Sequence, residues 1–207
     1  MSLRKTLEDL AAKRYIGPTE AFDFIHIALL IYYLGESAPK SRSELSKFLG
    51  LGEGSIRTIL KRLKSKAMIK ITRDGVVLDN NGVNLYKELK NVFPTLVSGS
   101  FGCFSLDQFS AIVQIRSAKN KVIKGLEQRD EAIKYGAKAA ITLVYKEKCF
   151  RFPDANEGYD ICYPLETWSK ILNAVTPDEG DVVIICSADS SYNALRSCIA
   201  AALTLSL

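Results

Sequence analysis

Residues 41–78 of this 207-residue sequence constrain the fold more than any other stretch. Their apolar residues follow two helical patterns and then a strand pattern, with only short turns between them. A capping box at Ser41 and Glu44 predicts the start of a short helix. A glycine-rich turn follows it, and then a second helical pattern over residues 55–66. Two β-branched runs around Asp74-Gly75 predict a hairpin. Short helix, tight turn, helix and hairpin in this order predict a winged helix-turn-helix.

The helix expected over residues 55–66 has one apolar face and one basic face. The apolar face repeats at i, i+3, i+4 and i+7 and consists of Ile56, Ile59, Leu60 and Leu63. The basic face consists of Arg57, Lys61 and Lys64, with Thr58 and Arg62 beside it. This helix has no acidic residue after Glu53. A helix that enters a DNA major groove needs such a division, with one face buried in its domain and cations and small polar groups on the other.

The remaining first half reads as helical. Leu3, Leu7 and Leu10 recur at helical spacing, Thr19 is expected to cap a longer helix that ends near Gly35, and a last helix is expected over residues 83–93. The only histidine, His26, falls on the apolar face of the long helix, where we interpret it as a core residue.

Charge is distributed unevenly along the chain. Residues 1–95 contain 16 Lys+Arg and 10 Asp+Glu, a balance of +6, whereas residues 96–207 contain 12 and 13, a balance of −1. We therefore expect two domains, 1–95 and 96–207, joined near Phe93-Pro94, and a polyanionic partner for the first domain alone.

In the second half, strands fall in hairpins and helices lie between them. The expected strands are residues 109–116, 139–146, 149–152 and 182–186, and the expected helices are residues 125–135, 165–175 and 187–205. The run 182–186 is almost continuously apolar, so we place it at the centre of the sheet, and we expect Asp189 to cap the last helix. The fold class is thus α+β, with a winged helix-turn-helix followed by a two-layer α/β sandwich whose sheet is mainly antiparallel.

Residues 49–63 resemble the recognition segment of archaeal winged-helix transcriptional regulators, which have an uncharacterised C-terminal α+β domain. Members of that family usually read leucine-threonine-glutamate-lysine-glycine after the wing, and here residues 78–82 keep the leucine and the glycine but change the middle. The resemblance is specific over residues 20–92. It implies DNA binding and, in the second domain, extends to the Arg129-Asp130 pair with the Ala-Ile and Gly-Ala pairs that follow it.

These observations predict a cytoplasmic, homodimeric transcription regulator that binds double-stranded DNA. Arg57, Thr58, Lys61 and Arg62 would face the groove, with Ser55 near its floor. The residues expected at phosphates are Arg42, Lys64, Lys70 and Arg73. A homodimer, suggested by the apolar helices at the two ends of the chain, would imply a two-fold operator.

Several other functions are disfavoured. One histidine and five cysteines without a C-x-x-C pair provide no spacing typical of a metal site, and no nucleophile–base pair is visible, so we expect no cofactor, no metal and no enzyme activity. We interpret the cysteines as reduced core residues and Asp178, Glu179 and Asp181 as loop residues. The glycine-containing segment 50–54 lacks the Gly-Lys-Ser/Thr ending of a phosphate loop. The apolar runs are too short to span a membrane, and residues 1–15 lack the apolar centre of a signal peptide.

Alternatives remain open for the second domain and for the whole chain. Arg129 and Asp130 form either an exposed ion pair or a pair that faces a small-molecule effector, with the arginine holding an anion. The chain as a whole could instead be a small-molecule enzyme with a fused regulatory winged helix, or a protein-interaction module. An enzyme would need a deep pocket near Arg129, and an interaction module would show no salt-dependent DNA binding.

Overall fold

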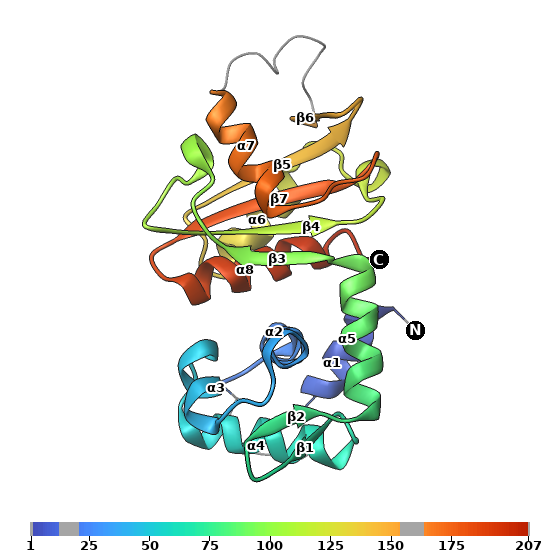
Figure 1. Ribbon diagram of the computed structural model, residues 1–207, viewed down its shortest axis with the longest axis vertical. Helices are drawn as coiled ribbons and strands as arrows, with labels where there is room; N and C mark the ends of the chain where they lie inside the picture. The colour runs from blue at the N-terminus through green and yellow to red at the C-terminus, as the bar shows by residue number, and fades with distance from the viewer. Residues whose placement is uncertain (1, 13–20, 154–163, 207) are drawn as a thin grey trace. The chain divides into compact units, whose positions relative to one another are not determined.

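The computed structural model describes residues 2–12, 21–153 and 164–206 (Figure 1). The chain divides into two compact units, Met1–Lys90 and Asn91–Leu207. This division lies a few residues before the boundary that we expected after residue 95. The expected position lies inside β3 (Thr95–Ser98), a strand of the second unit, because the chain enters that sheet directly after the preceding helix. Among the described residues, every helix is too short or too polar to cross a membrane.

The first unit contains five helices and one hairpin among its described residues. Its elements are α1 (Leu3–Ala11), α2 (Phe24–Ser37), α3 (Arg42–Leu49), α4 (Glu53–Ser65), β1 (Ile69–Ile71), β2 (Val76–Leu78) and α5, which spans Asn80–Val92. Their apolar faces meet in one core, in which the largest side chains include Ile25, Leu45 and Ile56. The predicted order of short helix, turn, helix and hairpin is confirmed.

Local capping fixes where these helices begin. The Glu44 amide donates to Ser41 Oγ at 3.2 Å and the Ser41 amide donates to Glu44 Oε2 at 2.8 Å, so the predicted capping box is confirmed. The backbone hydrogen bond from Ser41 lowers the pKa of Glu44. Helix α2 is capped by Asp23 rather than by Thr19, which lies outside the described residues. Asp23 Oδ1 accepts from the amides of Ile25 and His26, and the Asp23 amide donates to Nδ1 of the His26 ring, which is buried as expected.

The turn between α3 and α4 is shorter than expected. Gly50 adopts the left-handed conformation that ends α3, with φ 61°, and Gly52 is already the N-cap of α4. Residues 53 and 54 therefore belong to the first turn of α4 and not to a glycine-rich loop.

The hairpin is fastened to the rest of the first unit through its second strand. Val76 exchanges two backbone hydrogen bonds with Lys40, of 2.8 and 3.1 Å, so an antiparallel bridge continues beyond β1 and β2. At the end of the hairpin, a Cβ on Gly82 would collide with the Met68 carbonyl oxygen. This contact gives a physical reason for a glycine in the first turn of α5, because any side chain there would push the helix away from the hairpin.

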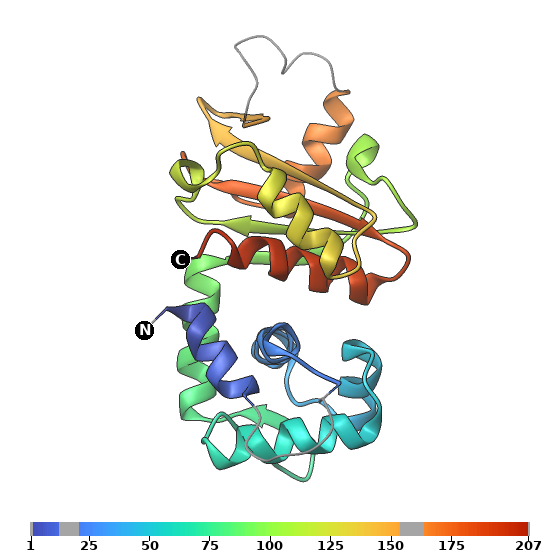
Figure 2. The ribbon, with the colours of Figure 1, turned by 180° about the vertical axis from the view of Figure 1, so that it is seen from behind.

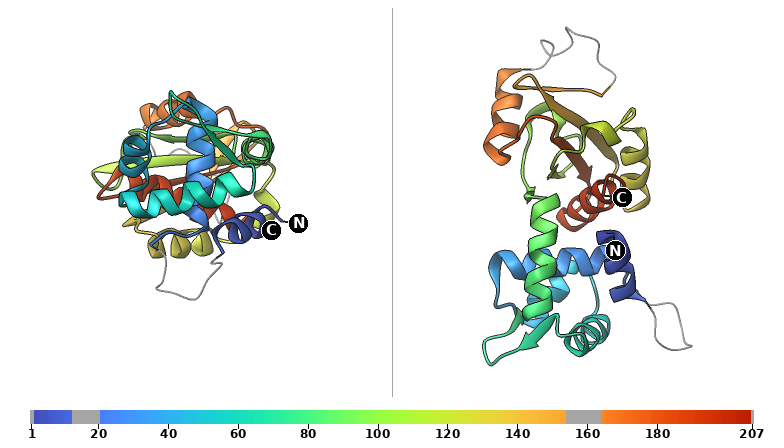
Figure 3. Two further views of the ribbon diagram at one scale, coloured as in Figure 1. Left: turned by 90° about the horizontal axis from the view of Figure 1, so that it is seen from below. Right: turned by 90° about the vertical axis from the view of Figure 1, so that its right-hand side faces the viewer.

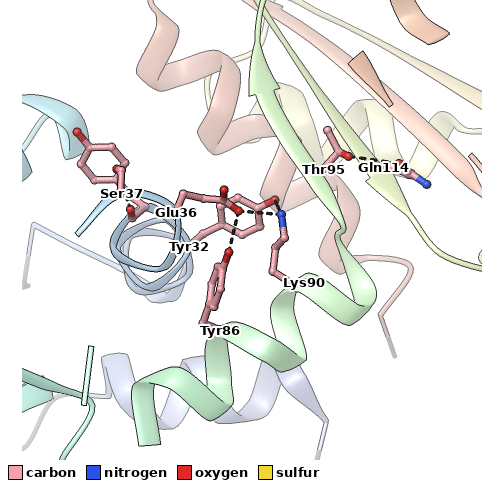
Figure 4. Close-up of polar contacts among 8 residues, drawn as sticks. Tyr32, Glu36, Ser37, Tyr86, Lys90, Thr95 and Gln114 are labelled. Carbon is pink, nitrogen blue, oxygen red and sulfur yellow. Dashed lines mark hydrogen bonds and ion pairs between the residues drawn. The ribbon is translucent and has the colours of Figure 1, made fainter. Parts of the chain in front are cut away.

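A polar cluster joins α5 to α2 (Figure 4). Glu36 Oε1 accepts from Tyr86 Oη at 2.9 Å and from Lys90 Nζ at 2.7 Å. Burial and the hydrogen bond to Glu36 raise the pKa of Tyr86 to about 12. Burial raises the pKa of Glu36, but the bonds from Lys90 and Tyr86 outweigh it, so the net shift is downward.

The second unit is built on a five-stranded sheet in which every neighbouring pair is antiparallel. In spatial order its strands are β3, β4 (Phe109–Ile115), β7 (Val182–Ala188), β5 (Ala139–Lys146) and β6 (Cys149–Arg151). The prediction that the apolar run 182–186 is central is confirmed, because β7 occupies the middle of the sheet and all its residues are buried. The predicted two-residue turn at Glu147-Lys148 is also present, with φ 54° and 64°.

Helices cover both faces of this sheet, so the predicted two-layer sandwich is wrong. The right panel of Figure 3 shows α7 (Leu165–Ala174) on one side and, on the other, α6 (Leu126–Lys134) and α8 (Ser191–Leu203). On the α7 side, Ile171 packs against Ile112 and Ile185 in a core that also holds Phe101 and Phe104. The N-cap of α8 is Ser190, not Asp189, because β7 continues to Ala188 and Ser190 accepts the Asn193 amide.

Candidate nucleic-acid interface

A small concave surface of the first unit gathers residues from three elements, and its cations come from two of them, α3 and α4. It has a volume of about 190 Å³, and we refer to it as the basic groove. Its lining residues are Arg42, Arg57, Leu60, Lys61, Lys64 and Ile71. Arg42 is the first residue of α3, Ile71 is the last residue of β1, and the other four lie on α4, so helix-turn-helix and hairpin together form the surface.

The amphipathic pattern of α4 determines which of its residues reach this surface. Its four apolar residues are at most 2% exposed and hold the helix against the core. Arg57, Lys61 and Lys64 are all exposed on the opposite face, as the spacing predicted. Burial of one face thus fixes the direction in which the basic face points.

The cations of the groove are not neutralised by neighbouring carboxylates. Within the described part of the chain, the residues without an ion pair include Arg42, Arg57, Lys61 and Lys64. The sequence from 54 to 73 contains no Asp or Glu and seven basic residues, namely Arg57, Lys61, Arg62, Lys64, Lys66, Lys70 and Arg73. Like charges held together on one surface create a positive potential that attracts a polyanion. Phosphate is the ligand that such a surface binds most readily.

The remaining expected contacts lie around the groove. Thr58 is exposed and its hydroxyl donates to the Gly54 carbonyl at 3.0 Å, which leaves its lone pairs for another donor. Ser55 is half-buried in the first turn of α4. Lys70 and Arg73 are exposed on the hairpin but are not among the residues that line the groove.

Arg62, expected at the base edges, faces the inside of the unit, and that expectation is corrected. Only 9% of its surface is exposed. Its Nη1 donates to the Ala11 carbonyl at 2.6 Å and its guanidinium lies 5.1 Å from the centre of the Phe22 ring. Lys66 likewise donates to the Asp9 carbonyl at 2.7 Å. Arg62 of α4 and Lys66, the C-cap residue of that helix, therefore bind carbonyls at the C-terminal end of α1, where the helix dipole is negative.

The Arg129-Asp130 pair is not arranged as a ligand site. Arg129 Nη2 and Nε donate to Asp130 Oδ1 at 2.9 and 3.1 Å, and both side chains are exposed. The guanidinium is paired with the neighbouring carboxylate in a surface contact. Of the two readings that the sequence left open, the geometry favours the exposed ion pair.

The acidic cluster in the second unit has a structural arrangement. Asp181 is buried and its Oδ2 accepts from Gln114 Nε2 at 2.7 Å and from the Asp178 amide at 3.0 Å. Its Oδ1 accepts from the Ser117 amide at 2.9 Å. These bonds hold the turn before β7. In the described ranges, no three His, Cys, Asp or Glu side chains are grouped so that they could hold a metal ion.

One cavity of the second unit was not predicted. It measures about 260 Å³ and lies between α7 and the β5–β6 hairpin, with Trp168 and Phe150 stacked 6.3 Å apart in its wall. The sequence predicted both the helix and the hairpin, but no periodicity indicates that α7 packs on this end of the sheet. The contribution of Leu60 and Ile71 to the basic groove was also missed, because periodicity within one element does not show how α4 and the hairpin pack together.

Comparisons with known proteins agree with the two-unit division. Residues 26–84 match the model of a family described as "PH0730-like, N-terminal domain", and residues 106–205 match a domain of unknown function (DUF4443). The chain is also similar to a solved structure, the "Hypothetical protein PH0730" from the archaeon Pyrococcus horikoshii OT3. The two are 28% identical with a TM-score of 0.73, over 89% of this chain and 92% of the other. No curated protein matches the chain.

Proposed function

We propose that this protein is a DNA-binding transcription regulator whose first unit is a winged helix-turn-helix. The observation that carries the proposal is the basic groove, in which unneutralised cations of α3 and α4 meet next to a basic hairpin. In this fold the second helix of the helix-turn-helix enters the major groove, and here that helix is α4. The resemblance of residues 49–63 to archaeal winged-helix regulators supports the proposal, and these residues lie within the segment that matches the PH0730-like N-terminal family.

The positions of the side chains suggest which residues contact bases and which contact phosphates. Arg57, Thr58 and Lys61 lie on the outer face of α4 and would reach base edges, with Ser55 behind them. Arg42 and Lys64 would contact phosphates at the sides of the major groove, and Lys70 and Arg73 would extend these contacts from the hairpin. Arg62 is excluded because its guanidinium is used inside the unit.

In the described residues of the second unit, no His, Cys, Asp and Glu side chains are grouped as a metal site requires. We propose a regulatory role for it, as a platform that joins copies of the chain or responds to an effector. A small-molecule enzyme would require perturbed carboxylates around Arg129, and that arginine instead pairs with Asp130 on the surface.

The proposal is tested by binding of the full chain to random-sequence duplex DNA at two salt concentrations. Four phosphate contacts give a slope of about −3.6 in log K against log salt, so affinity should fall roughly 150-fold between about 50 and 200 mM salt. The variant Lys61→Glu/Lys64→Glu should lose at least about tenfold in affinity at the lower salt concentration.

The matched control is Lys5→Glu/Lys87→Glu, which makes the same change of net charge at two exposed lysines outside the basic groove. It should bind within about threefold of the wild-type protein. Equal losses in the two variants would show that only net charge matters. Absence of binding at low salt would contradict DNA binding and favour a protein-interaction module.

A base contact is distinguished from a phosphate contact by substituting Arg57. If Arg57 reads a base, Arg57→Ala should lower affinity for the preferred sequence by about 1–3 kcal/mol and relax the preference at one position. A loss of the same size on every sequence would place Arg57 at a phosphate.

A further inference from the structure

Helix α6 of the second unit exposes apolar side chains on the face that turns away from the sheet. Leu126 and Ile133 are 45% and 49% exposed, and Ile123, just before the helix, is 72% exposed. In Figure 2, α6 (yellow) lies in front of the sheet with this face toward the viewer. Leu126 and Ile133 stand seven residues apart, so they lie on one line along the helix.

The opposite face of α6 is firmly attached to the unit. Ala132 and Gln128 are buried, and Gln128 Nε2 donates to Thr204 Oγ1, just after α8, at 2.9 Å. Leu126 and Ile133 leave about half of their surface exposed on this anchored helix. They sit on a helix whose position is already fixed, which makes them a pre-organised contact surface.

The charges on this face are arranged to complement themselves. Arg129 and Asp130 lie between Leu126 and Ile133, and the midpoint of the apolar pair, 129.5, falls between the two charged residues. If two copies of α6 pack antiparallel about a two-fold axis at this midpoint, Leu126 meets the partner's Ile133. Arg129 then lies close to the partner's Asp130 as well as to the Asp130 of its own chain, with which it already pairs. The acidic first turn of one helix, with Glu127, then lies beside the basic last turn of the other.

We infer that the exposed face of α6 is a dimerisation surface whose partner is a second copy of this chain. Like patches that complement themselves define an isologous interface, and a two-fold axis is its natural operator. The nine residues of α6 span only about 14 Å. That is too little for the ~800 Å² per partner of a permanent interface, so the dimer is weak and forms where copies are concentrated. The inference goes beyond the proposed DNA binding and does not depend on it.

The test is sedimentation velocity of the full chain without DNA, from about 5 to about 500 μM, which spans the range of weak dimers. The wild-type protein should shift from monomer to dimer across this range. Arg129→Asp places an aspartate next to the partner's Asp130 on both sides of the two-fold axis. This repulsion should raise the dissociation constant by about tenfold. Asp130→Arg should do the same with two arginines.

The double variant Arg129→Asp/Asp130→Arg is the decisive control. It restores opposite charges across the axis, so its dissociation constant should return to within about threefold of the wild-type value. Ile133→Glu should abolish the dimer, and circular dichroism checks that each variant is folded. A wild-type monomer at every concentration, single variants that dimerise normally, or a double variant that fails to recover would each overturn the inference.

Discussion

Arg62 offers a sharp test of the structure, because sequence and structure assign it opposite roles. If its guanidinium joins α4 to the end of α1, Arg62→Ala should destabilise the first unit. The lost hydrogen bond between a charged donor and the Ala11 carbonyl is worth about 1.5–3 kcal/mol. The contact with the Phe22 ring adds about 0.5–1 kcal/mol, so the total is roughly 2–4 kcal/mol.

The two units can be followed separately in one heating experiment. The chain has a single tryptophan, Trp168, and it lies in the second unit, so its fluorescence reports that unit alone. For a unit of this size, a loss of about 2 kcal/mol lowers the melting temperature by roughly 8–16 °C. Circular dichroism records the helices of both units, so Arg62→Ala should move only the first unit's part of the helical transition to lower temperature, while the Trp168 transition stays in place.

Lys61→Ala is the matched control on the same helix, because Lys61 is exposed and the substitution costs no helix propensity. It should leave the melting temperature unchanged and weaken DNA binding, whereas folded Arg62→Ala should bind DNA nearly as the wild type does. If Arg62→Ala melts normally and loses as much DNA affinity as Lys61→Ala, the packing of Arg62 against α1 is refuted.

Three further predictions concern other parts of the fold. Gly82→Ala should lower the melting temperature of the first unit by at least about 4 °C, since the new methyl overlaps a backbone carbonyl; an unchanged transition would show that α5 can shift at no cost. The hydrogen bond of Tyr86 should stabilise the fold fully below pH 10, and that contribution should be lost as pH rises through the Tyr86 pKa of about 12. The pKa of Glu36 is lowered, so its contribution should be present above the usual glutamate pKa of 4.5 and should be lost on acidification. Spectrophotometric titration of Tyr86→Phe should lack a tyrosine step near pH 12 that the wild-type protein shows, and an identical titration would contradict the assignment. Burial raises the pKa of Cys186, so in the folded protein a thiol reagent should modify exposed Cys149 quickly and Cys186 only after denaturation; equal rates would show that the sheet opens.

Local patterns predicted the order of elements well because each pattern depends on residues close together in the sequence. The capping box at Ser41 and the two-residue turn at Glu147-Lys148 are complete within four residues, and both are present. The basic face of α4 follows from helical spacing for the same reason. Where two caps were available within a few residues, as with Asp189 and Ser190, the extent of the preceding strand decided between them.

Features that depend on distant contacts were missed. Arg62 stands three residues after the buried Ile59, a spacing that could have indicated its partial burial, but the carbonyl it binds belongs to α1, about fifty residues earlier in the chain. The third layer of the second unit was missed because the apolar residues of α7 indicate only that one face is buried, not which face of the sheet it covers. Charge counts alone could not separate cations that bind inside the unit from cations that face solvent.

The central claim, that the basic surface of the first unit binds DNA, is tested most directly by the salt dependence of binding. Affinity for duplex DNA would be measured at five or so salt concentrations, for the wild-type protein and for Lys61→Ala/Lys64→Ala. We predict a wild-type slope of about −3.6 and a slope of about −2.7 for the variant, since each phosphate contact contributes about 0.9 and Lys64 is the one of the two lysines that we place at a phosphate. The same slope for both proteins would contradict the claim and place the DNA-binding surface elsewhere.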